Sequence, residues 1–317
     1  MQRESLMRTP SEVVNTVLED IASDEDVVVL SSLSDVDDCE RDYNIRDKDD
    51  DGWTPLMKAS EQGHTDIVRV LLEYGVNIQD DELKTSVIIA SERGHTDTVT
   101  ALIDYGADPN IPDKDGWTPL MKASHQGHTD TVKALIDYGA DTLVQSKFGW
   151  TLIIAASHQG HTNTVKFLLE EHGSDPKKQD FHGQTSVMIA SNQGHTDTVK
   201  FLLEKGVDIN IQDNFGWTAL MKAANESRAD TVRLLLDYGA DLNIQEKYGK
   251  SALSLARLSV IKLLIENKIR WNRRKGLIMM LAENGYFRSS SSFPSSLLRF
   301  ENVLGNEGLV QLIVSFL

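Results

Sequence analysis

Apolar residues along this chain recur in short blocks that have the spacing of amphipathic helices. In one block, the segment from Leu120 to Ser124 brings small and apolar side chains together, which suits a helix packed closely against a neighbour. In the next block, Val132, Leu135 and Ile136 fall at positions i, i+3 and i+4, the apolar stripe of a second helix. A glycine follows each block and is expected to end the helix. The pattern predicts a helix–turn–helix unit joined to the next unit by a polar loop.

The residues at the start of each block predict where the helices begin. Thr118 is followed by Pro119, so the hydroxyl can cap a free backbone N–H and proline takes the first helical position, where it loses no hydrogen bond. Thr129 is placed to cap the second helix, and Asp130 lies in its first turn, near the positive end of the helix dipole. We therefore expect a side-chain cap on both helices of the unit.

This unit is repeated along the chain. The phrase at residues 53–59, Trp-Thr-Pro-Leu-Met-Lys-Ala, returns nearly unchanged at 117–123 and 217–223, with diverged copies between them. The hydroxyl residues that mark the copies lie 31 to 34 residues apart: Thr54, Thr85, Thr118, Thr151, Thr185, Thr218 and Ser251. Such a period is typical of a solenoid, in which each repeat covers the apolar face of its neighbour.

The unit closely resembles the ankyrin repeat. The resemblance rests on the Thr-Pro-Leu helix start, on a Gly-His-Thr-Asp turn such as 127–130, and on the Leu-Leu/Ile…Tyr-Gly-Ala-Asp ending. It implies an all-α ankyrin-repeat solenoid with six full repeats, a degenerate N-terminal cap and a truncated seventh repeat. The chain departs from the family at positions such as Met121, where a histidine usually follows Thr-Pro-Leu, and in the sixth repeat, where 227–230 read Ser-Arg-Ala-Asp.

We expect three parts in the chain. Residues 1–46 form an acidic segment, in which 26–33 predict a helix of the capping repeat, and residues 47–267 form the ankyrin repeat domain. Residues 268–317 form a basic segment with a short helical extension. In this last part, 277–281 predict a helix and the serine-rich stretch 285–296 predicts a loop.

The C-terminal stretch 309–317 has apolar residues at helical spacing and leaves two interpretations open. It weakly resembles the first helix of F-box-like segments, which dock ubiquitin-ligase adaptors. The usual Leu-Pro start is missing and no further helices can follow, which favours a short helical cap on the open end of the array.

Composition and charge exclude several classes of partner. The formal net charge is -16, which repels phosphate backbones, so we expect no nucleic acid among the principal partners. Cys39 is the only cysteine, which suits a reducing compartment, and neither a signal sequence nor an apolar run long enough to span a membrane is present. These features predict a soluble monomer in the cytoplasm or the nucleus.

The histidines and carboxylates do not form a recognisable catalytic or metal-binding pattern. The histidines of the Gly-His-Thr turns occur one per repeat, and repeats stacked about 8–10 Å apart cannot easily bring them to one zinc ion. The same argument applies to His125 and His158. No phosphate-binding loop or nucleophile motif is found. We therefore expect no cofactor, no metal and no enzymatic activity.

The positions that differ between repeats predict where a partner would bind. In ankyrin-like arrays, loop tips and inner helices line a concave face that usually binds proteins. The candidate residues at these positions are Trp53, Lys58, Trp117, Lys122, His125, Trp150, His158, Gln184, Asn192, Trp217 and Lys222. Tryptophan is common in binding hot spots, and the lysines between the tryptophans would suit apolar and acidic side chains. Each tryptophan could equally pack onto the adjacent repeat.

The resemblance implies a non-catalytic scaffold that binds partner proteins through this concave face. The alternative is a substrate-recruiting subunit of a ubiquitin ligase, in which the array selects the target and the C-terminal helix docks the adaptor.

Overall fold

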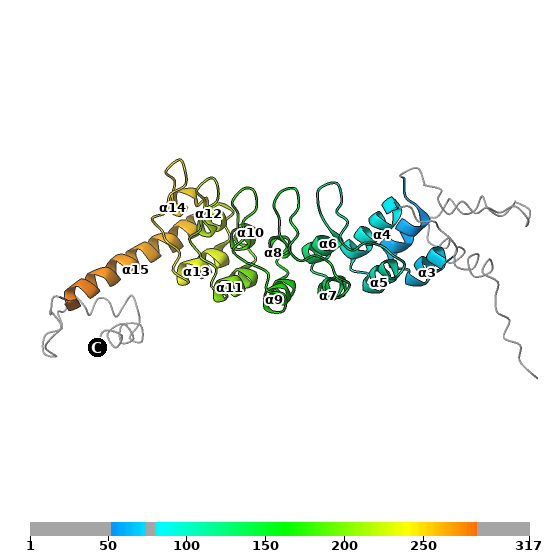
Figure 1. Cartoon of the computed structure of the whole chain (residues 1–317). Coiled ribbons are helices and arrows are strands. Elements are labelled where there is room, and N and C mark those ends of the chain that lie inside the picture. Colours follow the sequence, from blue (N-terminus) through cyan, green and yellow to red (C-terminus); the bar gives the residue numbers. More distant parts are fainter. Residues whose placement is uncertain (1–51, 74–79, 284–317) are drawn as a thin grey trace, which may run out of the picture.

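The computed structural model describes residues 52–73 and 80–283, without the side chains of 80–84 and 277–283, and this part is a row of helices (Figure 1). In chain order the helices are α2 (Pro55–Gln62), α3 (Thr65–Glu73), α4 (Asp80–Arg93), α5 (Thr96–Asp104), α6 (Pro119–Gln126), α7 (Thr129–Asp137), α8 (Leu152–His158), α9 (Thr162–Glu170), α10 (Ser186–Gln193), α11 (Thr196–Glu204), α12 (Ala219–Asn225), α13 (Ala229–Asp237), α14 (Ala252–Leu255) and α15 (Ser259–Glu283). The described residues contain no β-strand, only an isolated bridge between Gln245 and Ser251. The all-α solenoid predicted from the sequence is confirmed.

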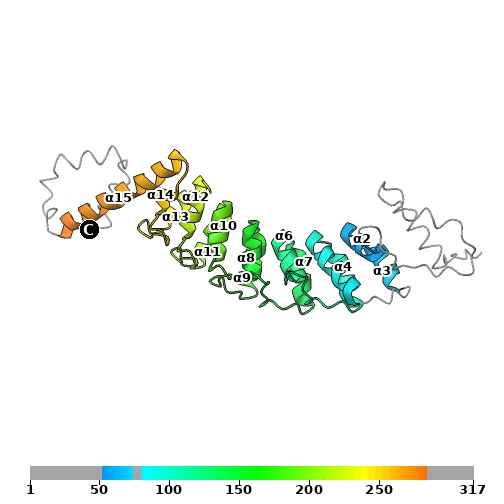
Figure 2. The same ribbon diagram turned by 90° about the horizontal axis from the view of Figure 1, so that it is seen from above.

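The helices alternate between two layers. The even-numbered helices α2 to α14 pack on one another and form an inner layer, and the odd-numbered helices α3 to α15 form an outer layer beside it. The loops between repeats project together past the inner layer (Figure 1), and the row follows a gentle arc when seen from above (Figure 2). One continuous apolar core runs through all the repeats.

Threonine caps the inner helices as the sequence predicts. The hydroxyl oxygen of Thr118 accepts a hydrogen bond from the backbone N–H of Met121 at 3.3 Å, and Thr54, Thr151, Thr185 and Thr218 make the same contact in their own repeats. A cap of this kind stabilises a helix by about 1 kcal/mol. Met121 can stand where the family usually has histidine, because the cap uses only the backbone N–H of this residue.

The outer helices begin differently, and the predicted cap at Thr129 is wrong. Thr129 is already the first helical residue, and the residue before it makes no side-chain cap. Its hydroxyl instead meets the hydroxyl of Thr164 in the next repeat at 2.8 Å. The same ladder joins Thr65 to Thr98, Thr96 to Thr131, Thr162 to Thr198 and Thr196 to Thr231. These threonines therefore join repeats rather than cap helices.

The turn histidines also join neighbouring repeats. The imidazole of His95 lies directly over Gly63, where a Cβ atom would collide with the ring, and its Nε2 is 2.8 Å from the carbonyl oxygen of Glu61. In the sixth repeat Arg228 takes the place of histidine, and its Nε donates to the carbonyl oxygen of Asn192 at 3.1 Å. The departure at 227–230 thus replaces one N–H donor by another and preserves the contact.

The end of each outer helix depends on glycine, and α15 lacks it. In the preceding outer helices of the Tyr-Gly type, glycines such as Gly139 and Gly239 adopt positive φ just after the last turn. Lys268 stands at the corresponding place in α15, and the helix continues to Glu283. The residues 277–281 are helical as predicted, and the composition boundary at 267/268 falls inside one unbroken helix. The inner helix of this repeat, α14, is only four residues long, in keeping with a truncated repeat.

Several sequence predictions lie outside the described residues: the acidic segment with its capping helix at 26–33, the loop at 285–296 and the apolar stretch at 309–317. In the part of the chain that is described, no helix has the length and apolar character needed to cross a membrane.

Candidate functional site

The candidate residues lie where the sequence places them, at the base of the loops and on the inner helices. All are partly buried, none fully enclosed and none fully exposed: Trp53, Lys58, Trp117, Lys122, His125, Trp150, His158, Gln184, Asn192, Trp217 and Lys222. We refer to this row as the concave face. Because each side chain touches both the protein interior and solvent, the row can support the fold and meet a partner at once.

Four rings of the third and fourth repeats form one aromatic cluster: Trp117, His125, Trp150 and His158. The ring centroids of Trp117 and Trp150 are 5.5 Å apart, and each tryptophan contacts the histidine of its own repeat at 5.2 and 5.1 Å. The two imidazoles stack on each other with centroids 5.5 Å apart. Both tryptophans also pack against the apolar core. The structure thus joins these four predicted residues into a single surface that spans two repeats.

The two histidines of the aromatic cluster are held in the neutral form. Burial lowers the pKa of His125 to about 4, and the neighbouring His158 adds to the shift. Burial also lowers the pKa of His158, with a smaller contribution from His195. Both imidazoles are therefore uncharged at neutral pH.

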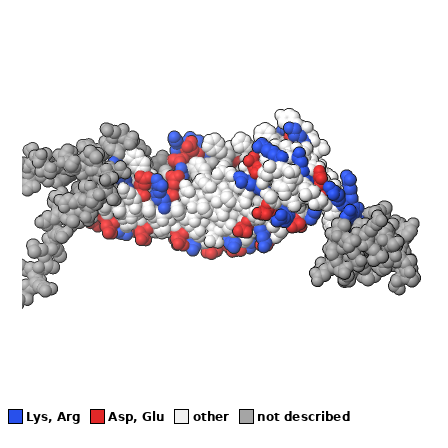
Figure 3. Space-filling model, turned by 180° about the vertical axis from the view of Figure 1, so that it is seen from behind, with Lys and Arg blue, Asp and Glu red and all other residues white. Residues whose placement is uncertain are grey.

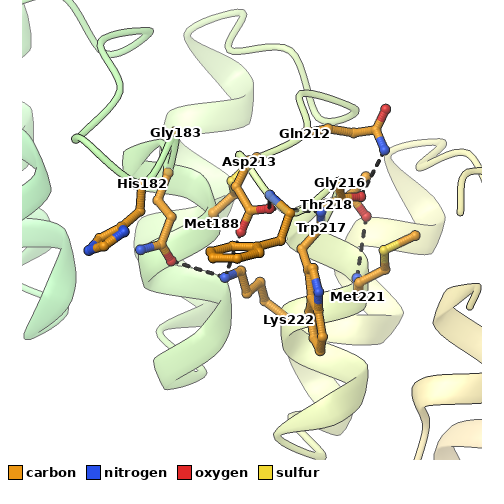
Figure 4. A network of polar contacts seen from close by, with 12 residues as sticks. His182, Gly183, Met188, Gln212, Asp213, Gly216, Trp217, Thr218, Met221 and Lys222 are labelled. Carbon is orange, nitrogen blue, oxygen red and sulfur yellow. Dashed lines mark hydrogen bonds and ion pairs between the residues drawn. The ribbon is translucent and has the colours of Figure 1, made fainter. Parts of the chain in front are cut away.

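Two lysines of the concave face, Lys122 and Lys222, each pair with an aspartate of their own repeat. Lys222 lies 2.8 Å from Oδ2 of Asp213, whose side chain is 1% exposed, and donates to the amide oxygen of Gln184 at 3.1 Å (Figure 4). Its ammonium group also lies 5.4 Å from the ring centroid of Trp217. Gln184, Trp217 and Lys222 are thereby brought together, in a network that Asp213 organises from the loop.

Lys122 repeats this arrangement in the third repeat. Its ammonium group is 3.4 Å from Oδ2 of Asp113, 3.7 Å from Glu92 and 5.6 Å from the ring centroid of Trp117. Because both lysines already face carboxylates, the positive charge that the sequence offered to an acidic partner is neutralised at these positions.

The two aspartates, Asp113 and Asp213, were missed by the sequence reasoning. Oδ1 of Asp213 accepts hydrogen bonds from the backbone N–H groups of Phe215 and Trp217, both at 2.9 Å, so one carboxylate shapes the turn and anchors the lysine. The fourth repeat has neither charge: Ser146 brackets the turn and Ala155 takes the place of the lysine. This matched exchange of aspartate with lysine is a signal that the sequence contains.

The remaining candidates lie apart from these two groups. Trp53 and Lys58 belong to the first repeat, at the other end of the described array. Asn192 lies in α10, where its backbone oxygen receives the Arg228 side chain. The concave face is thus a row of distinct local sites.

The structure changes one step of the argument about metal binding. The stacked imidazoles of His125 and His158 approach each other more closely than the spacing of the repeats, so the distance argument is wrong for this pair. Among residues 52–73 and 80–283, however, no group of three histidine, cysteine, aspartate or glutamate side chains could hold a metal ion.

Charge is distributed unevenly over the side of the array on which the inner helices lie. Figure 3 shows a broad area without charged side chains across the middle of the described part, with lysine, arginine, aspartate and glutamate toward both ends and along the lower edge. Close to the aromatic cluster, the charged side chain of Lys122 is paired with those of Asp113 and Glu92.

Comparisons with known proteins agree with this architecture. A family model for ankyrin repeats, built from three copies, matches residues 21–113, 87–180, 120–213 and 187–275. No curated protein matches the chain.

Solved structures of ankyrin domains resemble the fold. The ankyrin repeat domain of human ASB11 is similar with a TM-score of 0.62 and 29% identity, over 68% of this chain and 98% of that one. The ankyrin repeat domain of Bcl-3, a member of the IkappaB protein family, is similar with a TM-score of 0.56 and 26% identity, over 68% and 99% of the two chains. The family model covers well over half of the sequence. The chain therefore belongs to the ankyrin repeat family.

Proposed function

We propose that this chain is a non-catalytic binding module that recognises partner proteins through the concave face, with the aromatic cluster of Trp117, His125, Trp150 and His158 at its centre. The observation that carries the proposal is the partial exposure of four adjoining rings, two of which are neutral imidazoles. Aromatic side chains bury much apolar area on binding and lose little rotamer entropy, so such clusters often dominate binding energy.

The pairing of the lysines changes the partner that we expect at this centre. Lys122 and Lys222 face Asp113 and Asp213, so they act as spacers beside the tryptophans rather than as free positive charges. A partner would therefore place apolar or neutral polar side chains on the aromatic cluster. Charged side chains of the partner would lie farther along the array.

A pair of matched variants tests this proposal. Trp150→Ala removes a ring at the centre of the aromatic cluster, and Trp217→Ala removes a half-buried tryptophan in the same register outside the cluster. Affinity capture from the source cells should lose its specific partner with the first variant and retain more of it with the second, which alters the concave face away from its centre. Truncation of a hot-spot aromatic typically weakens binding by about tenfold or more.

Circular dichroism and thermal melting separate binding from folding. Both variants should keep their helical signal at the temperature of the capture. If Trp150→Ala alone unfolds, the variant His125→Ala/His158→Ala tests the same cluster and leaves both tryptophans in the core. Unchanged capture by both cluster variants would contradict the proposal.

The alternative function, recruitment of substrates to a ubiquitin ligase, depends on residues 309–317, outside the described part of the chain. It stays a prediction. Capture of a ligase adaptor by the full chain, and its loss after truncation at Glu283, would be required to support it.

A further inference from the structure

A second surface runs along the tips of the loops and borders the concave face. Five successive turns each carry two residues at the tip, and we call this row the tip ridge: Lys114-Asp115, Lys147-Phe148, Phe181-His182, Asn214-Phe215 and Lys247-Tyr248. All of them are exposed except Asp115, which is partly buried. Four of the five turns carry an aromatic residue there. Phe148 is 54% exposed, Phe181 65%, Phe215 54% and Tyr248 85%. Large apolar side chains exposed in a row mark interaction surfaces more often than isolated ones do.

The tip ridge is held together by its backbone. The N–H of the first tip residue in one turn donates to the carbonyl oxygen of the second tip residue in the turn before it: Lys147 to Asp115 at 3.1 Å, Phe181 to Phe148 at 3.1 Å, Asn214 to His182 at 2.9 Å and Lys247 to Phe215 at 3.1 Å. These bonds link five loops into one continuous structure. The aromatic side chains therefore stand on a pre-organised support, which lowers the entropy lost on binding.

Acidic side chains of these turns are largely directed inward. The residue that begins each turn accepts hydrogen bonds from the backbone of that turn. Asp180, Asp213 and Glu246 hold this position, and all three are buried. Asp180 and Glu246 accept backbone hydrogen bonds of their own turns, as Asp213 does. The charged residues at the tips are Lys114, Lys147 and Lys247 against Asp115 alone. On a chain with a net charge of -16, the tip ridge is a local positive surface.

We propose that the tip ridge binds an extended peptide segment in which an aliphatic or aromatic side chain recurs at about every third residue and carboxylates lie between these positions. The lysines attract the carboxylates, and the four exposed rings receive the apolar side chains. The backbone bonds of the ridge do not involve the rings, so the rings are available for this purpose. This surface is separate from the aromatic cluster, and the proposal does not depend on the function proposed for the concave face.

The spacing of the repeats sets the spacing of the peptide. Neighbouring repeats stack about 8–10 Å apart, and a peptide in the extended polyproline II conformation advances about 3.1 Å per residue with three residues per turn. An apolar side chain at about every third residue would therefore lie on one face of the peptide and meet one ring after another. A nucleic acid suits the tip ridge less well than an acidic peptide does. It carries a phosphate at every nucleotide, whereas the five turns carry only three lysines at their tips, and the net negative charge of the rest of the chain repels it.

A selection experiment tests both the chemistry and the spacing. A random library of 16-residue peptides displayed on phage is selected against the full chain, and again against the variant Phe148→Ala/Phe181→Ala/Phe215→Ala. The native chain should enrich acidic sequences with an apolar residue at every third position, and the variant should not. The most enriched peptide, made synthetically, should bind the variant at least about tenfold more weakly. Its binding should also weaken with salt.

Matched controls show whether the tip ridge is responsible. Tyr138→Ala removes a 41% exposed ring from the outer layer, where its hydroxyl bonds to Asp104, and should leave peptide binding unchanged. Trp150→Ala alters the concave face, so retained peptide binding by this variant distinguishes the two surfaces. Equal urea midpoints of the native chain and the triple variant establish that the fold is intact, and Phe215→Ala, a single substitution at an exposed position, replaces the triple variant if that variant is less stable.

Other results would overturn the proposal. Enrichment of basic peptides, or of sequences without the three-residue period, would contradict the inferred chemistry. Tighter binding of a 15-nucleotide oligouridylate than of the enriched peptide would show that the tip ridge is a nucleic-acid surface. An unchanged dissociation constant in the triple variant would place the peptide elsewhere.

Discussion

The buried ion pair between Asp213 and Lys222 makes a sharp prediction, because the chain contains its own control. Replacing Lys222 by alanine leaves the Oδ2 atom of Asp213 without its charged partner on a side chain that is only 1% exposed. Breaking a fully buried pair in this way costs about 3–5 kcal/mol. Lys222 itself is 17% exposed and water can partly replace it, so we expect a loss of about 2–3 kcal/mol in the free energy of unfolding.

The double variant Asp213→Ser/Lys222→Ala gives the sixth repeat the uncharged pair of residues that the fourth repeat has at these positions. There Ser146 accepts hydrogen bonds from the backbone N–H groups of Phe148 and Trp150, both at 3.2 Å, and Ala155 stands at the position that Lys222 holds in the sixth repeat. With no carboxylate left buried and the turn still bracketed, the double variant should lose no more than about 1 kcal/mol.

Urea denaturation followed by circular dichroism at pH 7 measures this difference. With a slope of about 2–3 kcal/mol/M, the single variant should shift the midpoint by about 1 M and the double variant by less than half of that. Repeat arrays can unfold in more than one step, so equal slopes in the three proteins are a necessary control. A double variant at least as unstable as Lys222→Ala would refute the reasoning, because it would show that the stranded carboxylate is not the cause.

Three further predictions concern other parts of the array. The hydroxyl of Ser124 is buried without a hydrogen-bond partner, and Ala224 stands at the same place in the sixth repeat. Ser124→Ala should therefore raise the free energy of unfolding by about 1 kcal/mol. A urea midpoint below that of the native chain would contradict this. The pKa of His125 is lowered from 6.5 to about 4, so the unfolded chain binds more protons between these values and stability should fall as pH drops from 7 to 5. After discounting for its partial exposure the loss from this residue is on the order of 1 kcal/mol, and His125→Gln should show a smaller loss in urea titrations at the two pH values. Lys268→Gly should restore the stop that Gly239 supplies in α13 and shorten α15, which a reduced helical signal in circular dichroism would detect; an unchanged signal would mean that the rest of α15 sustains itself.

Features encoded within one repeat could be predicted from the sequence. The cap at Thr118 depends on a residue three positions away, and the helix stop at Gly139 depends on its own backbone freedom. The cap predicted at Thr129 failed because this interaction is not local: the partner of the Thr129 hydroxyl is Thr164, in the next repeat. Nothing within the single unit distinguishes a threonine that caps a helix from one that bonds across an interface.

The candidate site divides in the same way. The partial exposure of Trp117, Trp150 and Trp217 follows from their register at the base of the loops, and this register is visible in the sequence. Whether each ring meets another ring or a lysine depends on the adjacent repeat: Trp150 reaches His158 and Trp117, whereas Trp217 lies beside a paired lysine. The exposed rings of the tip ridge were overlooked because they lie in turns, where aromatic residues carry no helical period.

The sequence by itself determined the period, the helix starts and stops, and the set of residues that face inward. These depend on backbone preferences and apolar spacing over about four residues, which every copy of the repeat contains. The tertiary structure decided which side chains of different repeats touch: the stacked histidines, the neutralised lysines, the threonine ladder and the linked turn tips. Those contacts join residues about 33 positions apart, and their distances are set by the stacking of whole repeats rather than by any local rule.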